Sequence, residues 1–141
     1  MADLNPLIRV RKHIVEQKQK FLAELYRHAD ELEEQKQGLL DQMAEERAKL
    51  DEMDLEFQNY FAPYSTAVKG YVAAIDYSHA ELEKRIDAAR EEMREAFAEL
   101  KKVEITQERR EEEDMAAIKK KESDELDEIG LEVFRRSREE S

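Results

Sequence analysis

The chain has 141 residues, of which 43% are charged, and its formal net charge is −12. Such an acidic balance argues against a nucleic-acid partner, because phosphate binding needs a clustered basic surface. The absence of cysteine excludes disulfides, thiolate metal ligands and thiol nucleophiles. No apolar run approaches the roughly 18 residues of a membrane span, and the first residues lack a signal-peptide core, so we expect a cytoplasmic protein.

The composition predicts an all-α protein built from long helices. Ala, Glu, Lys, Leu and Arg dominate, whereas the chain has only three glycines and two prolines. This bias is typical of coiled coils, and the length fits one domain. We therefore expect a single coiled-coil domain over residues 1–141.

Asn5 and Pro6 predict the start of a first helix, because Asn can cap a free N–H and Pro suits the first turn. Apolar or seam-compatible residues then recur at steps of three and four, which predicts a helix over about 6–61. The steps around Lys36 indicate a stutter, and Gly38 nearby weakens the helix by about 1 kcal/mol relative to Ala. The predicted seam of this helix consists of Leu4, Leu7, Ile14, Phe21, Leu25, Leu32, Leu39, Met43, Leu50, Met53, Phe57, Tyr60 and Tyr64.

Pro63 predicts the end of the first helix, since proline disfavours the helical conformation of the residue before it. The turn is expected over about 62–65, followed by a second helix over about 66–137. A competing capping box at Ser78 is rejected, because the apolar phase runs through it unbroken. The second seam consists of Val68, Val72, Ile75, His79, Leu82, Ile86, Ala89, Met93, Ala96, Leu100 and Val103, and a weaker pattern resumes at Met115, Ile118, Leu126, Ile129 and Val133.

Two long helices joined by a short turn are expected to fold back as an antiparallel two-helix coiled-coil hairpin. A fold about Pro63 would place Leu4 near Ser123 and leave the C-terminal end of the chain as an overhang. That overhang carries an apolar stripe for which the hairpin offers no partner. The stripe consists of Leu126, Ile129, Val133 and Phe134.

The segment 57–71 holds five of the ten Phe and Tyr residues of the chain. Phe57, Tyr60 and Tyr64 are in phase with the seam, so we expect them to form a packed core at the tip of the hairpin. The other rings lie off the seam and are candidates for a contact surface. These two residues are Phe61 and Tyr71.

No group of side chains predicts catalysis or metal binding. His13 and His28 lie on different faces, and His79 falls on the seam, where a polar residue more often sets the register than binds a metal. Carboxylate runs such as 110–114 are typical of solvated faces with i,i+4 ion pairs. Because a bare hairpin offers no concave pocket, we expect neither enzyme activity nor a cofactor.

The run KKKESDELDEIGLEVFRR, residues 119–136, resembles the ending of the FliJ family of flagellar type III export proteins and of their injectisome counterparts. In that family a charged helix closes on a Lys-rich, Leu-Asp-Glu-hydrophobic stretch followed by basic residues. The run LEKRI at 82–86 and the basic opening at 7–19 are similar to the family as well.

The resemblance implies a two-helix stalk, similar to the central gamma subunit of rotary ATPases, that does not itself hydrolyse ATP. It implies three partners: the export ATPase hexamer, the cytoplasmic part of the membrane export gate, and export chaperones. It implies neither a nucleic-acid partner nor a small-molecule substrate. The protein would then be peripheral at the inner face of the cell membrane, within the flagellar export apparatus.

The resemblance implies that the paired termini enter the ATPase ring and that the hairpin end contacts the export gate. The basic N-terminal turns are expected to lie beside the C-terminal residues, so that both face the ring. The expected ring contacts are Arg9, Arg11, Lys12, Leu126, Ile129, Val133, Phe134, Arg135 and Arg136. The expected gate contacts are Phe61, Tyr71, Tyr77 and Leu82.

Two other interpretations fit the same residues. A generic coiled-coil adaptor or homodimerising structural protein would pair its seam between chains rather than within one. An injectisome stalk would share the layout of a flagellar stalk and differ in the ATPase that it enters.

Overall fold

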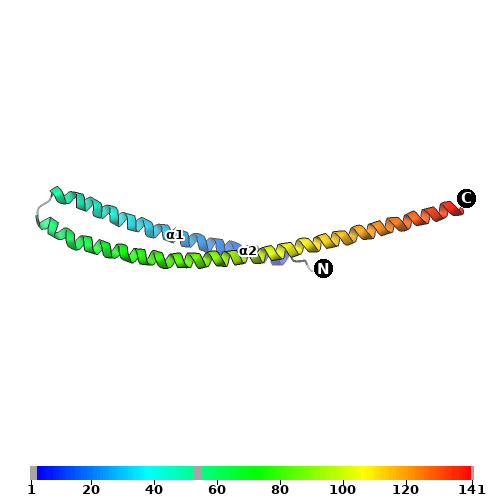
Figure 1. The fold of residues 1–141 in the computed structure, drawn as a ribbon, viewed down its shortest axis with the longest axis horizontal. Coiled ribbons are helices and arrows are strands. Elements are labelled where there is room, and N and C mark those ends of the chain that lie inside the picture. Colours follow the sequence, from blue (N-terminus) through cyan, green and yellow to red (C-terminus); the bar gives the residue numbers. More distant parts are fainter. Residues whose placement is uncertain (1–2, 53–54, 141) are drawn as a thin grey trace. The chain divides into compact units, whose positions relative to one another are not determined.

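The structure is a computed structural model that describes residues 3–52 and 55–140. Its elements are helix α1 (Asn5–Lys49), the short 3-10 helix η1 (Leu50–Glu52) and helix α2 (Leu55–Glu139), all shown in Figure 1. No strand occurs among the described residues. The all-α prediction is confirmed, and the two long helices form a helical hairpin.

The chain divides into two compact units, which are described separately. The first unit contains Met1–His13 and Phe97–Ser141, and the second is Ile14–Ala96. Both helices contribute residues to both units. The expected single domain over residues 1–141 stays a prediction.

In the second unit, the buried and half-buried residues of α1, apart from Ile14 and Leu40, follow alternating steps of three and four. This is the heptad spacing of a coiled-coil seam, so the predicted stutter at Lys36 is wrong. Phe21 was expected on the seam but is 43% exposed, and Leu22 is buried in its place. The sequence pattern missed this phase because Ala29 carries it with a small side chain. The seam of α1 in this unit consists of Val15, Lys18, Leu22, Leu25, Ala29, Leu32, Lys36, Leu39, Met43 and Glu46.

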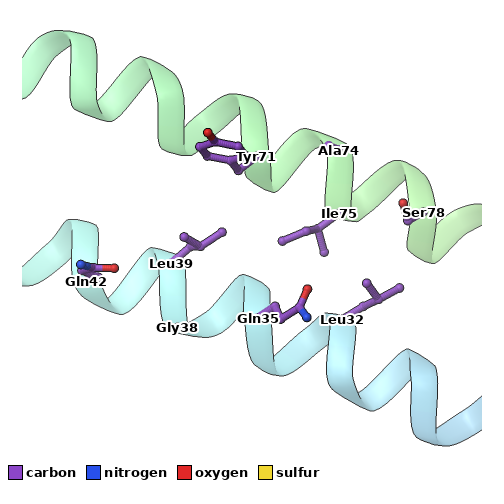
Figure 2. A pocket seen from close by; sticks show the side chains of 9 residues that line it. All are labelled: Leu32, Gln35, Gly38, Leu39, Gln42, Tyr71, Ala74, Ile75 and Ser78. Carbon is purple, nitrogen blue, oxygen red and sulfur yellow. The ribbon is translucent and has the colours of Figure 1, made fainter.

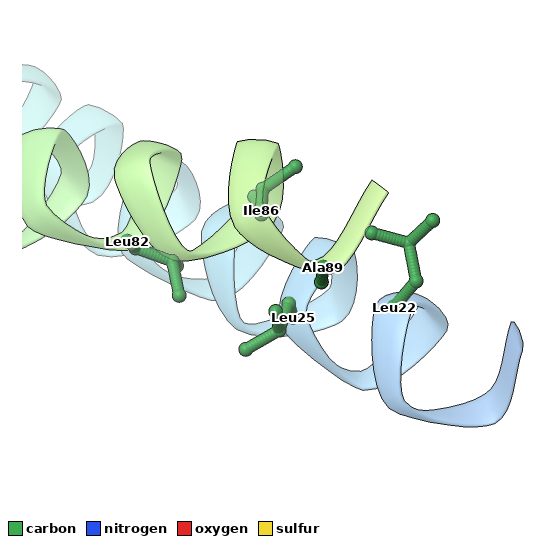
Figure 3. Packing of buried hydrophobic residues seen from close by; sticks show 5 residues of the cluster. All are labelled: Leu22, Leu25, Leu82, Ile86 and Ala89. Carbon is green, nitrogen blue, oxygen red and sulfur yellow. The ribbon is translucent and has the colours of Figure 1, made fainter. Parts of the chain in front are cut away.

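The core of the second unit is a thin layer between α1 and α2, shown in Figure 3. Leu22 and Leu25 of α1 pack with Leu82, Ile86 and Ala89 of α2. Leu82 and Ala89 are each only 3% exposed. The partly buried residues packed against this cluster are Ala29, Leu32 and Met93.

The predicted seam of α2 is confirmed from Val68 to Val103, because every one of its residues is buried or half-buried. In the first unit the same alternation reaches Gln107 and Arg110. Beyond this point, each described residue over 111–140 is exposed.

Ion pairs between α1 and α2 show the register of the two helices in the second unit. Lys18 Nζ lies 3.0 Å from Glu92 Oε2, and Lys36 Nζ lies 2.8 Å from Asp76 Oδ1. A hairpin folded at the predicted turn would instead place Lys36 opposite Glu91. The hydrogen bond to Asp76, together with the charge of that carboxylate, raises the pKa of Lys36 above its ordinary value.

The predicted turn at 62–65 is wrong, because α2 begins at Leu55 and contains Pro63 in its interior. Pro63 has no N–H, so the Asn59 carbonyl loses its usual helical donor. Both residues are exposed, and water can bond that carbonyl. Continuing the helix also brings Phe61 to a half-buried seam position, which offsets part of the cost of the proline.

The end of α1 at Lys49 lies well before the predicted end at residue 61. Asp51 and Asp54 are of a residue type that is favoured at helix starts and turns, but Pro63 was the stronger breaker in the sequence. Two expected seam residues are not covered by the structure: Met53 lies outside the described residues, as does the side chain of Phe57.

The first unit begins with the N-terminal turn of α1. Asp3 Oδ1 accepts a hydrogen bond from the Asn5 N–H at 3.0 Å, so Asp3 rather than Asn5 acts as the cap. The Leu4 N–H donates to Gln107 Oε1 of α2 at 3.1 Å. The predicted neighbour of Leu4, Ser123, is therefore wrong, because the early end of α1 shifts the register.

Candidate functional site

A large exposed apolar surface lies on the last part of α2, drawn in orange to red in Figure 1. Seven large hydrophobic side chains of the segment 111–140 are each more than half exposed. A run of uncovered apolar residues of this kind marks an interaction surface. The seven residues are Met115, Ile118, Leu126, Ile129, Leu131, Val133 and Phe134.

Five of these residues share one face of α2. At about 100° per residue, they fall within an arc of about 80°. Phe134 lies beside this face rather than on it, and its ring is 5.9 Å from the Arg138 guanidinium carbon. Leu131 lies on nearly the opposite side. We call the shared face the C-terminal stripe, and it consists of Met115, Ile118, Leu126, Ile129 and Val133.

The basic N-terminal turns do not lie beside the C-terminal stripe, contrary to the sequence-based expectation. Leu4 contacts Gln107, and α1 continues from there along α2 away from the stripe. Arg9 and Lys12 are exposed. Arg11 is half-buried, and its Nε is buried without a hydrogen-bond partner among the described residues. The predicted ring contacts therefore form two separate groups.

The C-terminal group includes two cations that follow the stripe. Arg135 and Arg136 are both exposed. Arg136 Nη2 lies 3.0 Å from Glu132 Oε1, an exposed i,i+4 ion pair that contributes little stability. Both cations are therefore accessible to a partner with acidic side chains.

The aromatic surface predicted near the turn belongs to the second unit and is only partly formed. Tyr71 and Tyr77 are 64% and 70% exposed, as a contact surface requires. Phe61 was predicted to lie off the seam, but it is half-buried, and its ring centroid lies 6.0 Å from that of Tyr64. It therefore belongs to the seam. Leu82 is 3% exposed and belongs to the core, which removes it from the predicted gate contacts.

Tyr60 and Phe61 exchange the positions that the sequence predicted for them. Tyr60 was placed on the seam but is 67% exposed. One heptad before the buried Val68 lies Phe61, not Tyr60. The spacing of seven residues from Val68 is thus the sequence signal that identifies Phe61 as the residue facing α1.

Sequence reasoning missed a groove between α1 and α2 in the second unit, shown in Figure 2. Its volume is about 790 Å³, and Leu39 and Ile75 point into the space between the helices. Small residues keep it open: a Cβ built on Gly38 would meet nothing within 4 Å. Tyr71 lines the groove and is itself largely exposed. The other lining residues are Leu32, Gln35, Gln42, Ala74 and Ser78.

The part of the chain that the structure describes shows no cluster of potential metal-ligating side chains. No group of three or more potential metal ligands occurs there. His79 occupies a half-buried seam position with its Nδ1 3.4 Å from Glu83 Oε1. None of the described helices has a stretch both long and apolar enough to span a membrane.

Comparison with known proteins adds no assignment: no family model, curated protein or solved structure matches this chain.

Proposed function

We propose that this chain is the central stalk of the ATPase ring in flagellar type III protein export. The observation that carries the proposal is the segment 111–140, in which every described residue is exposed. Most helical stability in proteins comes from tertiary packing, and the hairpin supplies none to this segment. The segment therefore needs a partner to supply that packing.

The distribution of apolar residues around this segment suits a ring. A single flat partner would cover the C-terminal stripe and leave the other faces in water. Leu131 and Phe134 are 58% and 61% exposed on faces outside the stripe. A ring lumen surrounds a helix and can contact all of these faces together.

The second unit is the proposed gate-contacting part of the stalk. Its helices pair along a continuous seam, which makes them suited to transmit force from the ring to the export gate. Tyr71 and Tyr77 form the proposed gate surface, from which the buried Leu82 is now removed. Export chaperones are the third proposed partner, and the protein acts as a peripheral component of the export apparatus without hydrolysing ATP.

A generic adaptor that pairs its seam between chains has less support. The cross-helix pairs Lys18–Glu92 and Lys36–Asp76 form within one chain, as does the core. An injectisome stalk would have the same layout, and separate binding measurements with the two kinds of ATPase distinguish these assignments.

Binding of the full chain to the purified export ATPase tests the proposal. We expect the triple variant Leu126→Asp, Ile129→Asp and Val133→Asp to bind at least about tenfold more weakly, a loss of about 1.4 kcal/mol, because it places three charges in an apolar contact. Calorimetric titration measures the affinity, and circular dichroism checks that helicity is kept.

The matched control is Leu55→Asp, which alters an apolar residue that is 76% exposed in the second unit. This variant is expected to bind as tightly as the unaltered chain. Equal affinity of the triple variant and the unaltered chain would overturn the stalk assignment.

A further inference from the structure

The groove between α1 and α2 in the second unit is lined only by uncharged residues, as Figure 2 shows, although 43% of the chain is charged. Leu39 and Ile75 point into the space between the helices, and polar lining residues such as Gln42 and Tyr71 are neutral. A charge buried without a partner is costly. The surface that fills the groove is therefore expected to be apolar and uncharged as well.

The residues that line the groove recur every seven positions. Leu32 and Leu39 are seven residues apart on α1, and Tyr71 and Ser78 are seven residues apart on α2. Seven residues of helix span about 10.5 Å, which is also the spacing of equivalent side chains on any helix with a heptad pattern. The groove therefore fits the apolar ridge of a third helix that runs along α1 and α2, rather than a single small molecule.

The α1 side of the groove is acidic. Gly38 lines the groove, and the residues one heptad before and after it, which share its face of α1, are both glutamates. The only cation within 31–45 is Lys36, whose Nζ lies 2.8 Å from Asp76 Oδ1 of α2. We call this side the acidic edge. It consists of Glu31, Glu34, Asp41 and Glu45, which are all exposed.

The α2 side of the groove differs from the acidic edge because it is uncharged. Within 58–75 the only charged residue is Lys69. At about 100° per residue, Lys69 points about 160° away from Tyr71, which lines the groove. A helix seated in the groove would therefore have carboxylates along one of its edges and neutral side chains along the other.

We propose that this groove binds an amphipathic helix of a partner protein. Its apolar ridge fills the groove, its basic residues lie over the acidic edge, and its uncharged residues lie over α2. Charge complementarity along one edge fixes which way the helix is turned and excludes helices with an acidic edge. This inference does not rest on the proposed function, and Tyr71 is the one residue that the groove shares with the proposed gate surface.

Two synthetic peptides of about four heptads, long enough to form a helix, serve as probes for the partner. They have the same apolar ridge and differ along one edge, which carries lysine in one probe and glutamate in the other. We expect the full chain to bind the lysine probe severalfold more tightly, and the difference to shrink as salt rises, because exposed charges are screened. Fluorescence anisotropy of labelled probes measures both affinities.

Reversal of the acidic edge separates local complementarity from the net negative charge of the chain. The double variant Glu31→Lys and Glu45→Lys is expected to prefer the glutamate probe. The matched control is Glu112→Lys with Glu113→Lys, which changes the net charge equally at two exposed residues outside the second unit. This control is expected to keep the preference for the lysine probe.

Two neighbouring alanines locate the site. Ala74 lines the groove, whereas Ala73 is exposed on another face of α2. Ala74→Lys is expected to weaken binding of the lysine probe at least about tenfold, and Ala73→Lys less than about twofold. Circular dichroism checks that both variants keep their helicity.

Four results would overturn the proposal. The first is that neither probe binds, and the second is that both bind equally. The third is an equal effect of Ala73→Lys and Ala74→Lys. The fourth is self-association of the chain that Ala74→Lys abolishes, measured by sedimentation equilibrium without a probe, because it would assign the groove to a second copy.

Discussion

Leu82→Ala is expected to lower the free energy of unfolding by about 2–3 kcal/mol. Leu82 is 3% exposed and packs in the only buried cluster of the described second unit, so its truncation removes contacts that nothing else replaces. We place the loss near the lower end of the range for buried leucines, because a layer only two helices thick leaves the new cavity open to water. Urea unfolding followed by circular dichroism measures it.

Leu131→Ala is the control for this prediction, since it removes the same atoms from a residue that is 58% exposed. Its effect is expected to stay within about 0.5 kcal/mol. The resemblance to export stalks placed Leu82 in a gate contact instead. If Leu82 were a gate contact, the two variants would have the same free energy of unfolding. Only weaker binding to the gate would then distinguish Leu82→Ala from Leu131→Ala.

Pro63→Ala is expected to raise the free energy of unfolding, because Pro63 lies inside α2. Proline in a helix interior costs about 3 kcal/mol relative to alanine. The flexible alanine also gives the unfolded chain more freedom, which removes up to about 1 kcal/mol of that gain. The net increase should be about 2 kcal/mol, measured by the same urea titration.

Pro6→Ala provides the comparison, since it alters the other proline of the chain. Pro6 lies in the first turn of α1, where a missing N–H costs nothing, so its replacement should be close to neutral. A proline that closed a turn would behave in the opposite way. Destabilisation by Pro63→Ala would restore the turn that the sequence suggested at 62–65.

The α2 seam could be predicted from the sequence because large apolar residues occupy eight of its eleven positions from Val68 to Val103. The α1 seam was predicted with errors, because Lys18 and Ala29 occupy inward positions that an apolar pattern passes over. Their partners lie on α2, as the Lys18–Glu92 pair shows. Such positions become visible only once the second helix is in place.

The position of the turn could not be predicted because local and tertiary preferences disagree there. Pro63 is the strongest breaker near the middle of the chain, yet the seam residues on either side of it keep one phase. Packing of Phe61 and Val68 favours a continuous helix. This one error shifted the register, so that Leu4 meets Gln107 rather than Ser123.

The same shift decided how much of the candidate site could be predicted. The exposed residues Leu126, Ile129 and Val133 were identified from the sequence, because an apolar stripe without a partner depends only on local spacing. Their expected proximity to Arg9 depended on the register and was therefore wrong. The exposed segment is longer than predicted for the same reason.

The central claim is that the segment 111–140 is left uncovered by the hairpin and is covered by the ATPase ring. Hydrogen exchange followed by mass spectrometry, on dilute protein with and without purified export ATPase, tests it most directly. We predict slow exchange for 82–100 in both samples, and fast exchange for 111–140 that slows strongly when the ATPase is added. Slow exchange of 111–140 in the chain alone, or unchanged fast exchange with the ATPase, would contradict the account.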